Sequence, residues 1–269
     1  MFCVRNFLLL LLIVTLSACV PAGPSIKEKK AQQADVHYKL GMSYLKGKDP
    51  TMALKELLIA VENGPDNAAI HAALAQAYQS KRAYSQAEQH YIKALVFSDN
   101  EPLYQNNLAS LYLEIKQWDK AIDLFGKAAS NLLFSQAHIS LTGKGYAYFM
   151  KQDYPAALKQ YKEAIIMAPR YPVAYFRESE AYAAMEQNEL AIDALKKAVE
   201  IAPGFTLALY QLGVMELKAQ QLVDASNRFA RIIELEPASE LGKKAEEMLR
   251  SLETDESANV EEDKAGSTE

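Results

Sequence analysis

Residues 108–128 read LASLYLEIKQWDKAIDLFGKA, and the spacing of small, aromatic and bulky residues in this stretch decides the fold. Ala109 and Ala121 are small, Tyr112 follows Ala109 by three positions, and Phe125 follows Ala121 by four. Offsets of three and four residues bring side chains onto one face of an α-helix. The stretch therefore predicts two helices whose small residues let them approach closely, while the aromatic side chains fill the space beside them.

The same pattern recurs in six copies, each 34 residues after the last except for a two-residue insertion near Gln136. A small residue comes early in each copy, an aromatic residue usually follows it by three positions, and an alanine follows it by twelve. The small residues are Gly41, Ala75, Ala109, Gly145, Ser179 and Gly213. The alanines are Ala53, Ala87, Ala121, Ala157, Ala191 and Ala225, and the bulky residues four positions further are Leu57, Tyr91, Phe125, Tyr161, Leu195 and Phe229. The last copy departs from the pattern, with Glu216 in the aromatic position.

These copies resemble the tetratricopeptide repeat over residues 34–239. The resemblance implies an all-α fold, a right-handed superhelix of about six antiparallel helix pairs. Four copies end at Pro65, Pro169, Pro203 and Pro237, where proline stops a helix. We expect a further helix over residues 238–252 to cap the last apolar face, since terminal repeats need a polar outer surface.

The N-terminus has the pattern of a secretory signal over residues 1–18, with Arg5 before an apolar run from residue 7 to 16. That run is shorter than the roughly 20 residues that span a bilayer. LSAC at 16–19 resembles the bacterial lipobox, which implies a diacylglyceryl group on the Cys19 sulfur, cleavage before Cys19 and acylation of the new amine. Two or more acyl chains anchor a protein stably. Val20, rather than Asp, implies sorting to the outer membrane, on its periplasmic face. The alternative is an ordinary signal peptide cleaved after residue 18.

The remaining chain divides by composition. Residues 19–33 contain two prolines, a glycine and then charges, and we expect a lipidated N-terminus and flexible tether. The repeat array with its capping helix follows over 34–252. Residues 253–269 hold seven acids and one lysine, and we expect a disordered acidic tail. The formal charge of −5 for the whole chain is then explained by the tail and by Arg5, so residues 19–252 are nearly neutral. A neutral body argues against nucleic acid as the partner.

No catalytic, cofactor or metal site is predicted. The four histidines show no paired metal-ligand spacing, and we interpret them as ordinary helix-surface side chains: His37, His71, His90 and His138. TGKGYAY at 142–148 lacks the pattern of a phosphate-binding loop. We therefore expect that the chain is not an enzyme.

The resemblance implies that the first helix of each pair lines a concave groove. Apolar and amide side chains fall at the groove positions: Tyr38, Met42, Leu45, Asn106, Leu113, Tyr146, Phe149, Phe176 and Tyr210. A groove of this character suits an apolar segment of a partner protein. The same side chains would also serve to pack neighbouring first helices, and both interpretations stay open.

The lipobox, the short tether and the repeats beginning HYKLGMSYL at 37–45 resemble the lipoproteins of type IV pilus biogenesis, the pilotin family. Asn106 and Asn107 in the third repeat and the longer connection after it carry the same resemblance. It implies a role in localising and assembling the outer-membrane secretin. The alternative is a general envelope scaffold that recruits peptidoglycan enzymes, proteases, or outer-membrane insertion or polysaccharide-export machinery.

Overall fold

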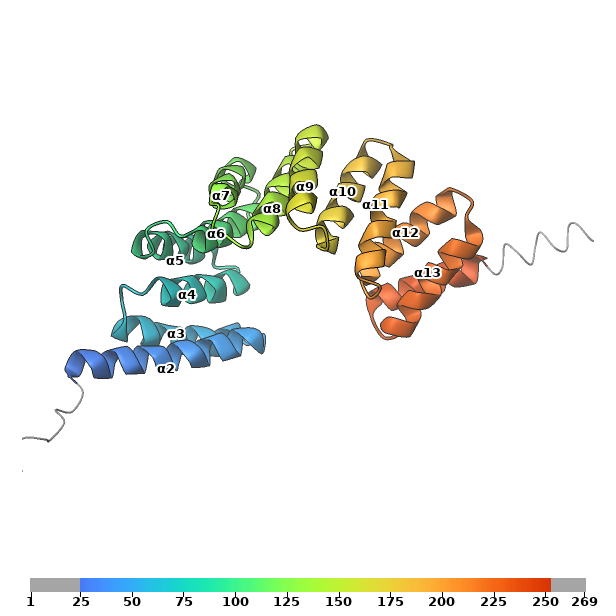
Figure 1. Cartoon of the computed structure of the whole chain (residues 1–269). Coiled ribbons are helices and arrows are strands. Elements are labelled where there is room, and N and C mark those ends of the chain that lie inside the picture. Colours follow the sequence, from blue (N-terminus) through green and yellow to red (C-terminus); the bar gives the residue numbers. More distant parts are fainter. Residues whose placement is uncertain (1–24, 253–269) are drawn as a thin grey trace, which may run out of the picture. The chain divides into compact units, whose positions relative to one another are not determined.

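The structure is a computed structural model that describes residues 25–252 (Figure 1). Every regular element within this range is an α-helix. The chain divides into two compact units, with the boundary between Phe97 and Ser98, and each unit is described by itself. Cys19, the signal sequence and the acidic tail lie outside the described residues, so the predictions for them stay predictions.

The first unit contains two helix pairs, α2 (Ile26–Lys46) with α3 (Pro50–Asn63) and α4 (Ala68–Ser80) with α5 (Tyr84–Phe97). Helix α3 also packs against α4, which joins the pairs (Figure 1). Leu57 and Leu74 are fully buried at the centre of this packing.

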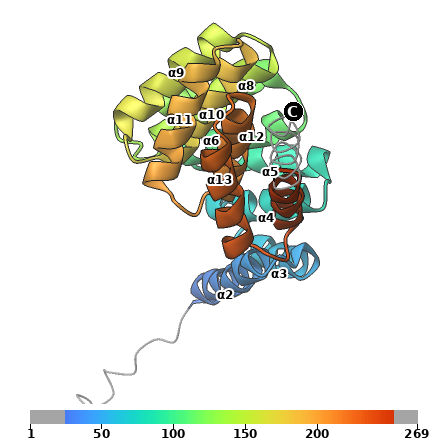
Figure 2. The same cartoon turned by 90° about the vertical axis from the view of Figure 1, so that its right-hand side faces the viewer.

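The second unit contains four pairs and a final helical segment. The pairs are α6 (Pro102–Glu114) with α7 (Trp118–Ser130), α8 (Ala137–Met150) with α9 (Tyr154–Met167), α10 (Pro172–Ala184) with α11 (Asn188–Ile201), and α12 (Thr206–Lys218) with α13 (Leu222–Leu235). Figure 2 shows α8 to α11 lying side by side. Residues 240–252 form the final helical segment. The six helix pairs predicted from the repeats are confirmed.

Small and bulky residues meet at each crossing as the spacing predicted. A Cβ added to Gly41 would lie 2.5 Å from Cγ of Leu57, and one added to Gly145 would lie 2.5 Å from Cε1 of Tyr161. Ala75, Ala109 and Ser179 are likewise buried at their crossings. Bulky side chains from the second helix of each pair therefore occupy the space that a larger residue on the first helix would need.

The turn inside every pair contains one residue with a left-handed backbone. The six residues recur with the repeat and have φ between 58° and 64°: Lys48, Arg82, Lys116, Gln152, Glu186 and Gln220. After each of them the next N–H donates back to a carbonyl near the end of the first helix, as in Asp153 N to Tyr148 O at 3.0 Å. This arrangement satisfies a carbonyl that the helix end leaves without a partner. The turn therefore reverses the chain in the same way in all six pairs.

The two-residue insertion lies in the connection between α7 and α8, residues 131–136. The corresponding connections before α4, α6, α10 and α12 have four residues each. Leu132 and Leu133 in the long connection are 99% and 95% exposed. The insertion therefore changes a surface loop and leaves the helices of the third and fourth pairs at their usual lengths.

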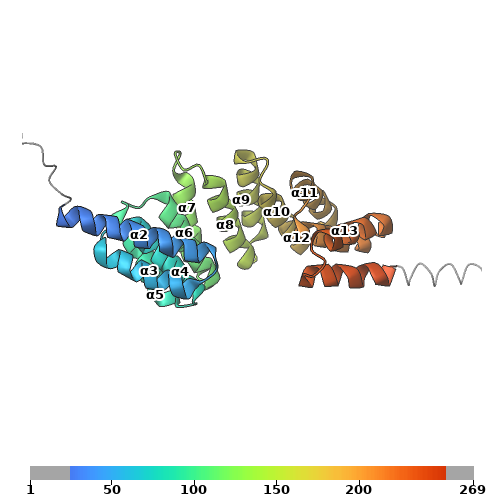
Figure 3. The same cartoon turned by 90° about the horizontal axis from the view of Figure 1, so that it is seen from below.

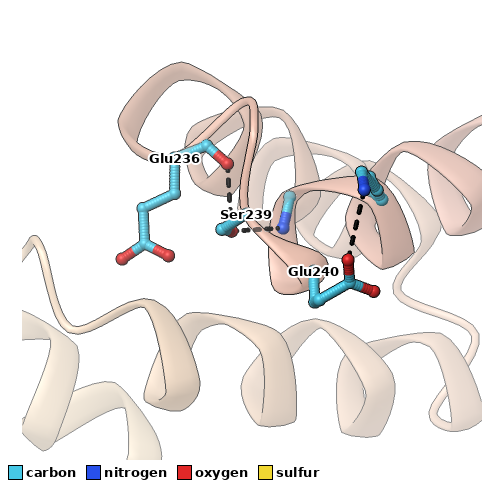
Figure 4. Close-up of polar contacts among 5 residues, drawn as sticks. Glu236, Ser239 and Glu240 are labelled. Atoms are coloured by element: carbon cyan, nitrogen blue, oxygen red, sulfur yellow. Dashed lines mark hydrogen bonds and ion pairs between the residues drawn. The ribbon is translucent and has the colours of Figure 1, made fainter.

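The final helical segment caps the last pair, as predicted, although it begins at residue 240 rather than 238. Ser239 accepts a hydrogen bond from the N–H of Gly242 at 2.9 Å and donates to the Glu236 carbonyl at 3.0 Å (Figure 4). A Cβ on Gly242 would lie 2.1 Å from that carbonyl oxygen. The segment lies beside α13 (Figure 3), and its Ala245 is buried in a cluster with Phe229 and Ile232.

Residues 26–33, which the sequence assigned to the tether, belong to α2 in the structure. The hydroxyl of Ser25 accepts from the Glu28 N–H while the Glu28 carboxylate accepts from the Ser25 N–H at 2.6 Å, so the two residues form a capping box. Reciprocal bonds of this kind begin a helix stably. No helix within residues 25–252 combines the length and apolar character needed to cross a bilayer.

Candidate functional site: two hollows and an N-terminal pocket

In the second unit, two shallow hollows are lined mostly by side chains of the first helices. The first hollow, about 210 Å³, is lined by Ser110, Leu113, Phe125, Ile139, Thr142, Gly143, Tyr146, Tyr171, Val173 and Arg177. The second hollow, about 320 Å³, is lined by Phe149, Glu180, Ala183, Tyr210, Gln211, Val214 and Met215. Most of these side chains are apolar or aromatic, so each hollow can take an apolar side chain of a partner.

An ion pair and stacked aromatic rings connect residues that line the two hollows. Arg177 lines the first hollow, Glu180 lines the second, and their side chains form an ion pair at 2.7 Å. The Arg177 guanidinium also lies 4.4 Å from the ring centroid of Tyr146, and the rings of Tyr146 and Phe149 stack at 6.3 Å. The two charges therefore compensate each other, and the surface between the hollows carries little net charge.

A buried hydroxyl, that of Tyr161, lies close enough to Arg177, Glu180 and Tyr146 for their charges and dipoles to act on it. Tyr161 is fully buried, and its hydroxyl has no hydrogen-bond partner within residues 25–252. Burial raises the pKa of Tyr161, against a smaller opposing effect of Arg177, so the hydroxyl stays protonated. An unpaired buried donor costs free energy, and this residue is therefore held in place by packing against the Gly145 backbone rather than by hydrogen bonding.

The first unit has a larger cavity, which we call the N-terminal pocket, with a volume of about 830 Å³. It lies between the N-terminal half of α2 and the connection from α3 to α4. Its lining is Ile26, Lys27, Lys30, Ala31, Ala34, Asp35, Tyr38, Asn63, Gly64, Pro65, Asp66, Asn67, Ala69 and Ile70. Apolar walls thus alternate with charged and amide groups at its rim.

The predicted groove residues are divided between these places. Leu113 and Tyr146 line the first hollow, and Phe149 and Tyr210 line the second. Tyr38 lines the N-terminal pocket. In the first unit, Met42 is 37% exposed, whereas Leu45 packs against the cluster around Leu57.

Asn106 and Phe176 are not part of an open surface. The Asn106 Oδ1 accepts from the Ser140 hydroxyl at 2.8 Å, a buried bond that links α6 to α8. Phe176 is 5% exposed and packs against the Phe205 ring, with centroids 5.0 Å apart. Both side chains therefore serve the packing between helices, the second of the two interpretations that the sequence left open.

Arg177 and Glu180 are not among the predicted groove residues, because those are the apolar and amide side chains at the groove positions. Glu180 falls at the repeat position of Met42 and Tyr146, and Arg177 precedes it by three residues on the same helix face. An oppositely charged pair with this spacing was the available signal.

The prediction of surface histidines is wrong for His71, which is 3% exposed. Its Nε2–H donates to the Pro65 carbonyl at 2.7 Å, so its Nδ1 accepts from the His90 Nδ1–H at 2.9 Å. Burial first, then the His71 ring and Lys93, lower the pKa of His90 to about 4, and burial also lowers the pKa of His71. Two neutral imidazoles thus hold the connection between α3 and α4 in place.

Within residues 25–252, no three possible metal-ligating side chains gather in one place. The described surfaces offer apolar hollows with charged side chains beside them, which are components of a protein-binding surface.

Comparison with known proteins agrees with this fold. A family model described as tetratricopeptide repeat matches residues 38–102, 106–172 and 142–205. The type IV pilus assembly protein PilF of Pseudomonas aeruginosa is 29% identical over 164 residues, which cover 60% of this chain and 65% of PilF. The small glutamine-rich tetratricopeptide repeat-containing protein 2 of Mycosarcoma maydis is 30% identical over 104 residues, or 39% of this chain and 30% of that protein. The chain thus spans less than two thirds of the length of either relative.

Two solved structures show the same fold. P. aeruginosa PilF superposes with a TM-score of 0.66 at 17% identity, covering 82% of this chain and 99% of the other. PilW, described as a widely conserved type IV pilus biogenesis factor, superposes with a TM-score of 0.69 at 19% identity, covering 79% and 98%. At these identities the likeness concerns the fold alone.

Proposed function

The chain belongs to the tetratricopeptide repeat family, and from this premise we propose that it is a scaffold lipoprotein of the bacterial outer membrane that assists secretin assembly in type IV pilus biogenesis. In this proposal, lipids on Cys19 hold it at the periplasmic face. The hollows of the second unit and the exposed surface around Met42 in the first unit bind segments of a secretin subunit or of another envelope protein.

The relationship with PilF is the observation that carries the proposal. The alignment covers 60% of this chain, more than the 39% covered by the fungal relative, and PilF is by its name a pilus assembly protein. The two apolar hollows on the first helices of the second unit add a physical reason, because a repeat scaffold acts by holding a partner's side chains in such places.

The anchor is tested by the change Cys19→Ala, which removes the thiol that the lipobox chemistry requires. We expect an uncleaved or soluble protein in place of a membrane-bound one, measured by fractionation and by the mass of the mature chain. Unchanged fractionation and mass would contradict lipidation.

The binding surfaces are tested by two double variants, Tyr38→Ala with Met42→Ala in the first unit and Tyr146→Ala with Phe149→Ala in the second. Loss of one buried anchor costs about 2 kcal/mol or more, which corresponds to roughly 30-fold in the dissociation constant. The control is Lys196→Glu, an exposed residue of the second helix α11. The assay counts heat-resistant secretin multimers and surface pili in a deletion strain complemented with each variant.

The expected result is an anchored protein that fails to assemble secretin multimers in at least one double variant, with normal assembly by the Lys196→Glu control. Normal multimers and pili in the uncomplemented deletion strain would contradict the secretin role. That outcome would favour the general envelope scaffold, for which the same hollows would bind a different partner.

A further inference from the structure

We propose that the N-terminal pocket is a docking surface for anionic phospholipid, so that the first unit contacts the membrane directly as well as through its anchor. The inference rests on the lipid anchoring proposed above, because that anchoring is what places a membrane next to the pocket. The pocket's own chemistry can be tested without the anchor.

The walls of the pocket suit the apolar part of a lipid. Ile26, Ala31 and Ala34 of α2 face Pro65 and Ile70 across a volume of about 830 Å³. Ile26 is the first residue of α2 and is 79% exposed, although isoleucine is usually buried. An exposed aliphatic side chain beside an apolar cavity contributes favourably once lipid covers it.

The rim of the pocket suits an anionic headgroup. Lys27 and Lys30 line it, and neither forms an ion pair with another residue of the described chain. Asp35 also lines the pocket, but its carboxylate is paired with Lys39 at 2.6 Å. Asp66 is then the remaining acid of the lining, so the unpaired charges of the pocket are two positive and one negative.

The position of the pocket along the chain restricts its distance from the membrane. Five residues lie between Cys19 and Ser25, the cap of α2, so six residue-to-residue steps join them. At about 3.5 Å per residue, these can extend at most about 21 Å. A chain anchored at Cys19 therefore keeps the start of α2 within that distance of the lipid headgroups, where the effective concentration of phospholipid is high. Lysines near an anionic surface are attracted over about one Debye length, about 8 Å at physiological salt.

The experiment uses the chain from residue 20 onward, which lacks the anchor and contains every described residue. Flotation with vesicles of phosphatidylglycerol and phosphatidylethanolamine is compared with flotation with vesicles of phosphatidylcholine alone. We expect binding to the anionic vesicles only. The change Lys27→Gln with Lys30→Gln should weaken it by about 25-fold, about fivefold for each lysine. Ile26→Gln should weaken it without changing the charge.

The matched control is Lys46→Gln with Lys48→Gln, which removes the same charge at the opposite end of α2. Both lysines are exposed, and the turn position of Lys48 accepts glutamine, as Gln152 and Gln220 show in other repeats. We expect this variant to bind as the parent chain does. Circular dichroism of all variants checks that the fold is retained.

Three outcomes would overturn the proposal: no binding of the parent chain to anionic vesicles, equal loss in the two double variants, or release of the chain by inorganic phosphate at matched ionic strength. The last result would assign the pocket to free phosphate. Because these vesicles contain no secretin, failure here leaves the pilus role intact. If the chain binds anionic vesicles as expected but the deletion strain still has normal pili, the pilus role is rejected and the lipid proposal stands.

Discussion

Gly145 shows how one missing methyl group sets the distance between two helices. The change Gly145→Ala would place a Cβ 2.5 Å from Cε1 of the fully buried Tyr161. Neither the ring nor the helix can move freely in a packed interior, so we expect a loss of about 1–3 kcal/mol in the free energy of unfolding, measured with urea.

Gly126→Ala is the control for that change, because Gly126 is also inside a helix. Its Cβ would find nothing closer than the flexible Lys144 Nζ at 3.6 Å. Alanine is favoured over glycine in a helix by about 1 kcal/mol, so this variant should be more stable than the parent chain. If both changes destabilise the chain equally, the loss at Gly145 cannot be assigned to close packing at its helix crossing.

His90 makes the stability of the first unit depend on pH. Its pKa is about 4 in the folded chain, below the value near 6.5 expected after unfolding. The unfolded chain therefore binds a proton that the folded chain does not, and stability falls as the pH drops from about 6.5 to about 4. With allowance for the partial exposure of His90, we expect the free energy of unfolding to fall by about 1–2 kcal/mol over this pH range.

The measurement is urea unfolding at pH 7.5 and pH 5 for the parent chain and for His90→Gln. The variant should lose this part of the pH dependence. The same dependence in both would assign it to another group, such as His71, whose pKa is also lowered by burial.

The residues at the crossings could be predicted from sequence because each recurs six times, whereas the histidine pair could not. His37 and Glu56 stand at the same two positions one repeat earlier, so only the position of His71 recurs as histidine, and His90 lies on a different helix. The contact between His71 and His90 depends on how α4 and α5 pack, and a histidine that recurs at one of the two positions does not reveal it.

At the scale of the helix, α13 holds Glu216 in place, the one residue that departs from the aromatic repeat position. Glu216 is fully buried, and Arg228 of α13 contacts its carboxylate at 3.2 and 3.4 Å. Arg228→Met would leave a buried charge without its partner, so we expect a loss of about 2–4 kcal/mol. On the same helix, Arg231→Met removes an exposed pair with Glu234 and should cost less than about 1 kcal/mol.

Thermal and urea unfolding of the two arginine variants gives the comparison. If Arg228→Met is as mild as Arg231→Met, water reaches Glu216 after the change, and the ion pair is not needed for this crossing.

The ends of helices were predicted less well than their existence. Pro65, Pro169 and Pro203 each stand two residues after a helix ends, as expected. The predicted tether overlaps the start of α2 although SIKE at 25–28 has the capping-box pattern, because the charges that follow are also typical of a tether. The left-handed turn residues include no glycine, so composition does not mark them.

For the whole chain, the helical segment 240–252 and the acidic tail should differ in importance. The segment buries Ala245 against Phe229 and Ile232, with Leu241 and Met248 beside them. Truncation after residue 252 should leave the melting temperature almost unchanged, since the tail has no apolar periodicity. Truncation after residue 239 should lower it, because it exposes the apolar face of the last pair. A large loss after the first truncation would show that the tail contributes to stability.

The candidate site was only half predictable at this scale. Tyr146, Phe149 and Tyr210 lie where the repeat positions placed them, whereas Asn106 and Phe176 are buried at positions of the same kind. Repeat spacing assigns a residue to a helix face, but the size of its neighbours decides whether it reaches the surface. That information is spread over several helices and is not contained in one position.

The long connection at 131–136 also makes the second unit vulnerable to proteases. Leu132 and Leu133 are almost fully exposed, and chymotrypsin cleaves beside leucine and phenylalanine in exposed segments. A single cut there would break the backbone between α7 and α8, but the packing between these helices would remain. Phe125 of α7 packs so closely on Gly143 of α8 that an added Cβ would lie 2.5 Å away. Nicked protein should therefore elute as one particle from a sizing column and separate into two fragments only in detergent, which would provide two halves for reassembly.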